Sequence, residues 1–204
     1  MLISVLMPAY NAAEYIDDAI KSITCQSHRE LELIIIDDGS YDETLSIIQR
    51  HAAVDPRIRF KSRKNKGIVY TLNELIDLAQ GTYIARMDCD DIAHTNRLSH
   101  QLKYLKRHHL DICGAQIQSS ILRRALLYKP TKHAQIMFHS LYDTPFWHPT
   151  VFGKASIFKK HKYGLKYKNA EDYALWTDLI KEGYVLGNCP ETLLYYRWHD
   201  HQLS

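Results

Sequence analysis

Carboxylates occur at two points in the chain, and each group directly follows a run of apolar residues. The first group is Asp37 and Asp38, and the second is Asp88, Asp90 and Asp91. Carboxylates that converge repel one another and are costly unless a cation neutralises them. Their hard oxygen ligands suit Mg²⁺ or Mn²⁺ better than zinc. The two groups therefore predict a divalent-cation site, provided that the fold brings them to one place.

Neither acidic group matches a common calcium-binding or phosphate-binding loop. Each group alone is also typical of a turn or a helix cap. An EF-hand loop counted from Asp88 fails, because Ala93 stands where the turn glycine belongs and Ser99 where the bidentate glutamate belongs. A P-loop and a GxGxxG fingerprint are both absent from the sequence. A phosphate ligand is therefore expected to bind through a metal and not in a glycine-rich cradle.

The elements that must position these groups alternate between strand and helix patterns. Strands are expected at 3–9, 31–36, 57–61 and 82–87, with helices in between, which indicates an α/β domain with a mostly parallel sheet. Asn11 with Glu14, and Ser40 with Glu43, have the spacing of helix capping boxes. Ligands of open α/β sheets bind beyond the carboxyl ends of the strands, so both acidic groups are expected on one rim.

The second half of the chain has a looser pattern. A strand is expected at 111–118, an irregular segment up to about residue 147, a helix at 171–182 and a late strand at 193–196. Gly183 follows the helix and suits its end. Arg86 and Arg97 flank the second acidic group and are expected to pair with its carboxylates.

Composition excludes several classes of protein. The chain has 204 residues, 46% of them hydrophobic, and a formal net charge of +3. This charge is too small to indicate a nucleic-acid partner, although a weakly basic surface favours visits to anionic lipid. The four cysteines form no CxxC pair, which favours reduced thiols in the cytosol. The sequence contains no apolar run long enough to span a membrane, and its first residues do not form a signal peptide.

Ordered motifs along the chain closely resemble family 2 glycosyltransferases of the GT-A fold. They are VLMPAYN (5–11), IDDGS (36–40), NKG (65–67), ARMDCDD (85–91), HPT (148–150), AEDYALW (170–176) and YRWH (196–199). The resemblance implies a Rossmann-like single domain over residues 1–204. In that domain, residues 1–110 would bind a nucleotide-sugar, and residues 111–204 would bind the acceptor and carry catalysis.

The resemblance also implies a role for individual residues. Those expected to bind the donor nucleotide, usually a uridine diphosphate, are Pro8, Ala9, Tyr10, Asn11, Asp38, Asn65, Lys66, Gly67 and Asp88. Asp90 and His199, together with Asp88, would hold Mn²⁺ or Mg²⁺. Asp172 is the expected general base, with Glu171 beside it. His148 and Trp176 are expected near the acceptor.

The expected activity is that of an inverting glycosyltransferase that acts on a glycan or a lipid-linked glycan acceptor. The family's common setting is surface polysaccharide synthesis in the cytoplasm, at the inner face of the cytoplasmic membrane, which implies peripheral membrane contact. Two alternatives stay open: a catalytically silent nucleotide-sugar-binding module, and a nucleotidyltransferase. The second would normally carry a glycine-rich basic motif near the N-terminus, which residues 7–11 do not form.

Overall fold

The first half of the chain alternates strands and helices, as its apolar pattern predicts. A computed structural model describes residues 1–120, 126–167 and 170–199. Its elements in this half are β1 Ile3–Ala9, α1 Ile16–Thr24, β2 Leu31–Asp37, α2 Thr44–Val54, β3 Ile58–Ser62, α3 Ile68–Leu78 and β4 Tyr83–Arg86. Every residue of β1 and β2 is buried, which explains why both strands are mostly apolar; the Ser4 hydroxyl donates to the Glu32 carboxylate beside it (2.6 Å).

The second half contains the elements that the sequence pattern predicts and several short elements that it does not predict. They are β5 Ile92–Ala93, α4 Arg97–Arg107, β6 Ile112–Ser119, β7 Leu126–Leu127, α5 His133–His139, a 3₁₀ turn at His148–Thr150, β8 Phe152–Lys154, α6 Ala155–Lys160, α7 Glu171–Lys181 and β9 Leu186–Tyr196. Among the described residues, no helix is both long and apolar enough to cross a membrane.

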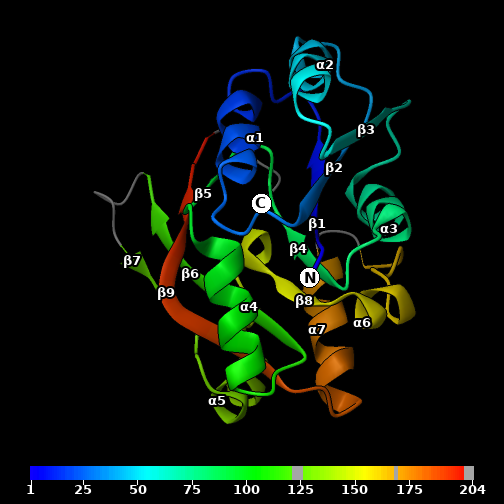
Figure 1. Ribbon diagram of the computed structural model, residues 1–204. Coiled ribbons are helices and arrows are strands. Elements are labelled where there is room, and N and C mark those ends of the chain that lie inside the picture. The colour runs from blue at the N-terminus through cyan, green and yellow to red at the C-terminus, as the bar shows by residue number, and fades with distance from the viewer. Residues whose placement is uncertain (121–125, 168–169, 200–204) are drawn as a thin grey trace.

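One mixed sheet contains the described strands, in the order β3-β2-β1-β4-β8-β6-β9-β5, with β7 attached to β6 (Figure 1). β3, β2, β1 and β4 are mutually parallel, while β8 is antiparallel to both of its neighbours. Ala9 lies opposite Asp37, and Leu6 lies opposite Arg86. The chain therefore leaves β1, β2 and β4 at the same edge of the sheet, and Asp38 and Asp88 follow on that edge.

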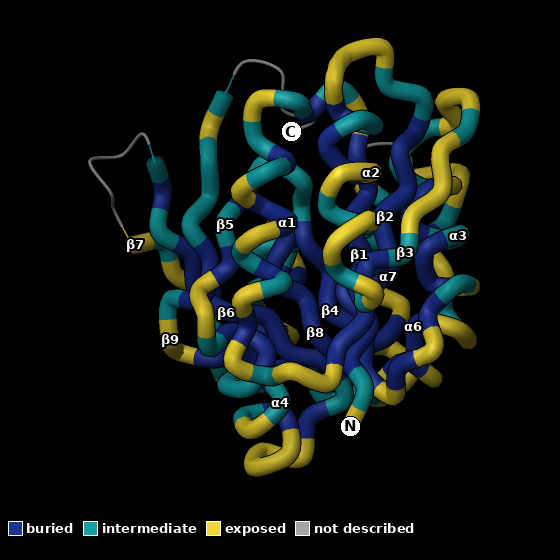
Figure 2. Tube along the Cα trace, turned by 45° about the horizontal axis from the view of Figure 1, so that its top comes forward, coloured by how far each residue is buried: buried dark blue, intermediate teal, exposed yellow. Residues whose placement is uncertain are grey.

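Helices cover both faces of the sheet, so the protein has three layers. Ile3, Val5 and Met7 of β1 pack with the buried side chains of α1, α2 and α4. Leu6, on the opposite face of the same strand, packs with α3, α6 and α7. Figure 2 shows the strands buried in the middle, with exposed positions on the outer turns of the helices. This two-sided burial makes the sheet a rigid support for the loops at its edge.

The two expected capping boxes are wrong. α1 begins after Tyr15 and α2 after Glu43, and neither helix has a side-chain cap. The Asn11 side chain instead accepts a hydrogen bond from the Tyr41 backbone N–H (3.1 Å), and the Ser40 hydroxyl accepts one from the Asn11 N–H (2.9 Å). The side chains of Asn11 and Ser40 therefore bond to the neighbouring loop and do not cap a helix of their own.

Further bonds join the same two loops. The Ala12 N–H donates to Thr44 Oγ1 (2.7 Å), and the Ala13 N–H donates to Asp42 Oδ2 (3.0 Å). The loops that follow β1 and β2 are therefore tied together at several points, at the edge where the sequence places a ligand.

Candidate active site

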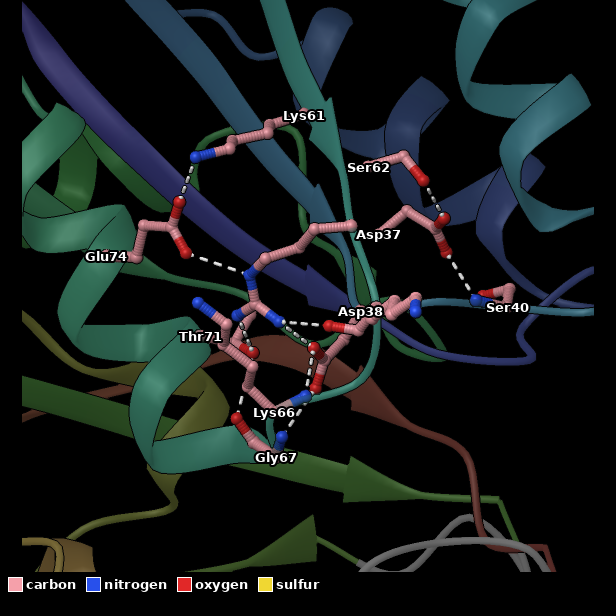
Figure 3. A network of polar contacts seen from close by, with 11 residues as sticks. Asp37, Asp38, Ser40, Lys61, Ser62, Lys66, Gly67, Thr71 and Glu74 are labelled. Atoms are coloured by element: carbon pink, nitrogen blue, oxygen red, sulfur yellow. Dashed lines mark hydrogen bonds and ion pairs between the residues drawn. The ribbon is translucent and has the colours of Figure 1, made fainter.

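The first part of the candidate site is built on Asp38, which directly follows β2. Its side chain is 7% exposed and accepts hydrogen bonds from the backbone N–H groups of Lys66 and Gly67, both at 2.9 Å. It also forms an ion pair with Arg63. Gly67 has φ of 88°, a conformation that L-residues avoid, and it begins helix α3. The loop 65–67 is thus held against Asp38, as Figure 3 shows.

Tyr10 and the loop residues beside Asp38 present an accessible surface. Tyr10 is 45% exposed, and its ring lies 6.3 Å from that of Tyr41 in an edge arrangement. Asn65 and Lys66 are exposed as well. Pro8 and Ala9 are buried in β1, so they can offer a ligand only the edge of their backbone. An aromatic face next to exposed polar groups and a carboxylate suits a planar, polar ligand.

The second acidic group begins with Asp88, which is paired with Arg86. The two carboxylate oxygens of Asp88 lie 2.6 Å from the two terminal nitrogens of Arg86. The Arg86 side chain is only 9% exposed. This two-point ion pair fixes the orientation of Asp88, as expected from the sequence. Arg97 is also buried, but it donates to the Arg86 carbonyl (2.6 Å) and to Gln101, and no carboxylate pairs with it among the described residues.

Asp90 and Asp91 are tied to the last described residues of the chain. His199 Nε2 lies 3.0 Å from Asp90 Oδ2, and the imidazole ring stacks on Tyr15 at 4.6 Å. Asp91 is fully buried and accepts a hydrogen bond from the Arg197 backbone N–H (3.0 Å). The end of β9 is thereby held against the loop that follows β4.

This acidic group fits a divalent cation. One carboxylate oxygen from each of Asp88, Asp90 and Asp91 lies within 4.8 Å of the others. Asp90 Oδ1, Asp91 Oδ2 and His199 Nδ1 are buried and have no hydrogen-bond partner in the described part of the chain. Burial raises the pKa of Asp91 well above its usual range, and the charges of Asp88 and Asp90 raise it further. Unpartnered buried oxygens of like charge are the environment that a Mg²⁺ or Mn²⁺ ion would relieve.

The expected base, Asp172, lies in the first turn of α7 and faces the 3₁₀ turn. Asp172 Oδ2 is 4.0 Å from His148 Nδ1, and His148 Nε2 is 2.9 Å from the Tyr163 hydroxyl. Burial, together with the nearby charge of Arg86, lowers the pKa of His148 well below its usual value. His148 is therefore neutral at pH 7, and Asp172 faces an imidazole and not a cation.

Arg86 lies between the metal-binding candidates and the candidate base. Its pKa is raised by the charges of Asp88 and Asp172, although burial opposes them. Burial is the main cause of the raised pKa of Tyr163, and the charges of Asp172, Glu171 and Asp88 raise that pKa further. The second acidic group and the start of α7 therefore share one electrostatic environment.

Trp176 and Glu171 are two further residues of α7 that the family resemblance places in this region. Trp176 is fully buried and packs edge-on against Phe146 and His148. Its ring therefore supports His148 and offers no exposed surface to a ligand. Glu171 Oε2 is buried and has no partner among the described residues. Glu171 lies beside Asp172, as expected, and its charge acts on Tyr163.

A family model described as Glycosyl transferase family 2 matches residues 4–165. The chain belongs to glycosyl transferase family 2. An uncharacterised glycosyltransferase of Haemophilus influenzae is 35% identical over all of this chain and 67% of its own length. The putative glycosyltransferase EpsE of Bacillus subtilis is 32% identical over 94% of this chain and 71% of its own length. The putative teichuronic acid biosynthesis glycosyltransferase TuaG of the same bacterium is 27% identical over the whole chain and 81% of its own length.

Solved structures show that this family 2 chain has the GT-A fold. S. aureus TarS 1–349 in complex with UDP-GlcNAc matches with a TM-score of 0.84 at 20% identity, over 99% of this chain and 60% of that one. The mannosyltransferase PcManGT of Pyrobaculum calidifontis, in complex with GDP-Man and Mn²⁺, matches with a TM-score of 0.76 at 19% identity, over 98% and 57%. The chain therefore spans about three fifths of the length of these two structures.

The family motifs did not point to several residues that shape the site. Arg63 binds Asp38, Arg197 presents its backbone to Asp91, and Tyr163 binds His148. Arg63 could have been suspected from the basic run 63–66 directly before Gly67. Arg197 stands in the motif YRWH, but the motif does not indicate its backbone contact with Asp91, and Tyr163 carries no signal, because both contacts join separate segments of the chain.

Proposed function

We propose that this chain transfers a sugar from a UDP-sugar to a hydroxyl acceptor, with inversion at the anomeric carbon. The observation that supports this most strongly is the common location of three groups: the Asp38 loop, the acidic group 88–91, and Asp172. The first two follow parallel strands at one edge of the sheet. The third, Asp172, acts with Asp88 on the same arginine, because the charges of both carboxylates raise the pKa of Arg86.

The donor nucleotide would lie against Tyr10 and loop 65–67, with Asp38 facing the base and Asn11 supporting the loop. Asp90, His199 and Asp88 would hold Mn²⁺ or Mg²⁺. Asp90 Oδ1 and His199 Nδ1 are buried without a partner among the described residues, and a carboxylate oxygen of Asp88 lies within 4.8 Å of one of Asp90. A divalent cation bound there stabilises the charge that develops on the departing diphosphate. Arg86 keeps Asp88 oriented toward that ion or the ribose.

Asp172 would take the proton of the acceptor hydroxyl as the acceptor oxygen attacks the anomeric carbon. A glycosidic C–O bond forms, the bond between the anomeric carbon and the diphosphate breaks, and UDP leaves. If Nε2 of a neutral His148 accepts a hydrogen bond from the Tyr163 hydroxyl, the imidazole carries its proton on Nδ1. Because 4.0 Å is too long for a direct bond to Asp172, a hydroxyl group or water between the two would bridge them.

The acceptor that we propose is a glycan or lipid-linked glycan of a surface polysaccharide. The support is the name of one relative, the putative teichuronic acid biosynthesis glycosyltransferase TuaG. Such acceptors lie at the cytoplasmic face of the cell membrane, so peripheral contact with that membrane belongs to the proposal.

Asp172→Asn tests the transfer. We expect UDP release from a panel of UDP-sugars with Mn²⁺ to fall about 10²–10⁴-fold, because a general base contributes about that much. UDP affinity, measured by calorimetry, should change less than twofold. Asp178→Asn is the matched control, since Asp178 lies in the same helix but is 59% exposed. Near-normal turnover of Asp172→Asn would rule out this base. UDP binding with no release from any UDP-sugar would favour a silent binding module.

A further inference from the structure

A buried arginine next to the donor loop takes no part in the transfer proposed above. Arg63 follows strand β3, and its side chain is 10% exposed. Burying a guanidinium is costly unless its N–H groups are paired. The contacts of Arg63 therefore indicate what holds it and what it holds.

The guanidinium of Arg63 is fixed from three sides. Its Nε donates to Glu74 Oε2 (2.9 Å), and its Nη2 donates to the Thr71 hydroxyl oxygen (2.9 Å). Both partners belong to α3, and Figure 3 shows Glu74 and Thr71 on the opposite side of the network from Asp38. The third side, Nη1, pairs with Asp38 Oδ1. Because the guanidinium is planar and rigid, helix α3 sets the position of the Asp38 carboxylate through it.

The Asp38 carboxylate accepts hydrogen bonds from three N–H groups. Oδ1 accepts from Arg63 and from the Lys66 N–H (2.9 Å), and Oδ2 accepts from the Gly67 N–H (2.9 Å). A carboxylate offers about four acceptor positions in all. Within the described residues, these contacts leave about one position, on Oδ2, and it too can only accept a hydrogen bond.

We propose that Arg63 is a positioning residue that holds the Asp38 carboxylate where it meets N3 of a pyrimidine base, and so sets the preference for uracil over cytosine. This rests on the proposed function, in which Asp38 faces the base. Uracil carries a hydrogen on N3, which suits a single remaining acceptor position. Cytosine has a lone pair on N3, which would face the carboxylate acceptor to acceptor, and its N4 amino donor could reach Asp38 only if the ring shifted from that position. A site built around a hydrogen bond rejects a ligand that cannot make it.

The test compares UDP and CDP, each with Mn²⁺, by isothermal titration calorimetry on the whole chain. We expect the wild type to bind UDP about 10–100-fold more tightly than CDP, which corresponds to one hydrogen bond to a charged group. Arg63→Gln should bind UDP about tenfold more weakly and reduce the ratio to near one. A general loss of packing would weaken both ligands together and leave the ratio unchanged.

Lys61→Gln is the matched control. Lys61 donates to the same Glu74 carboxylate (2.5 Å) but is 54% exposed and does not contact Asp38. It should keep wild-type affinities. If Arg63→Gln does not fold, Arg63→Lys serves instead, because lysine keeps the charge but cannot bridge three partners; its ratio should fall at least threefold.

Three results would overturn the proposal: a wild type that binds UDP and CDP equally, a folded Arg63→Gln with the wild-type ratio, or an unchanged ratio in Arg63→Lys. A wild type that binds neither nucleotide would overturn the proposed function as well. A wild type that selects UDP through Arg63 but releases none from UDP-sugars would overturn the transfer and leave this inference standing.

Discussion

Because Arg86 pairs with Asp88 and not with Asp90, we expect the loss of each carboxylate to change the free energy of unfolding by very different amounts. Asp88→Asn removes the charge opposite an arginine whose side chain is 9% exposed. Breaking a buried ion pair costs about 3–5 kcal/mol. Asp88 is 23% exposed, and the amide oxygen still accepts one of the two bonds, so we expect a loss of about 2–3 kcal/mol. For a chain of this size, that lowers Tm by about 4–12 °C.

Asp90→Asn is the comparison. Its described side-chain contact is with His199, and its other oxygen has no partner in the parts of the chain that the structure describes. Replacing it relieves repulsion and should change the free energy of unfolding by less than about 1 kcal/mol. Calorimetric melts in EDTA measure both variants against the wild type.

A second set of melts, with UDP and Mn²⁺, separates folding from binding. The wild type should gain about 2.7 kcal/mol at 100 times the dissociation constant, and Asp90→Asn should lose most of that gain. If Asp88→Asn melts within about 2 °C of the wild type, or if Asp90→Asn falls as far in EDTA, the role assigned to the Arg86 pair is wrong.

Two further predictions concern His148 and Gly67. Because burial and Arg86 lower the pKa of His148, the unfolded chain takes up this proton first, near pH 6.5, so stability is complete above that pH and falls below it. Urea denaturation should show the wild type losing about 1.4 kcal/mol more than His148→Gln between about pH 7.5 and 5.5, and parallel slopes would contradict this. Gly67→Ala should cost about 1 kcal/mol or more, because φ is 88°, and should weaken UDP binding. Gly183→Ala, at φ 85° and also with open space around the added carbon, should cost as much in melts yet leave UDP affinity unchanged; equal UDP affinities in the two variants would refute the role of loop 65–67.

The half of the fold that the sequence predicts well consists of strands buried on both faces. β1 and β2 are rich in apolar residues, with only Ser4 and Glu32 as polar residues before Asp37, so their bounds were predicted to within one residue. β8 was missed because three residues, one of them a glycine, are too few to show a period. β9 was predicted only for its last residues, since its first part contains polar Asn188 and Pro190. The Asn188 amide is buried and donates to the Pro130 and Pro145 carbonyls, a tertiary contact that no local pattern indicates.

For the site, the sequence predicted which residues gather but not how they are paired. The placement of Asp38 and Asp88 on one edge follows from strand ends, and the pairing of Arg86 with Asp88 is local enough to anticipate. The capping boxes failed because Asn11 and Ser40 bind each other's loops. Trp176 is conspicuous in its motif, yet packing inside the core explains its place.

The contact between His199 and Asp90 spans 109 positions of the chain, and the Arg197–Asp91 bond spans 106. During synthesis, the acidic group therefore emerges from the ribosome long before the residues that close it. Until β9 has joined β6, three neighbouring carboxylates have neither the histidine nor the backbone donor beside them. A nascent chain can build the Asp38 loop early, but the contacts of Asp90 and Asp91 form only after Arg197 and His199 have been synthesised and β9 has joined the sheet. Tight binding of the proposed cation would thus report that β9 has joined the sheet.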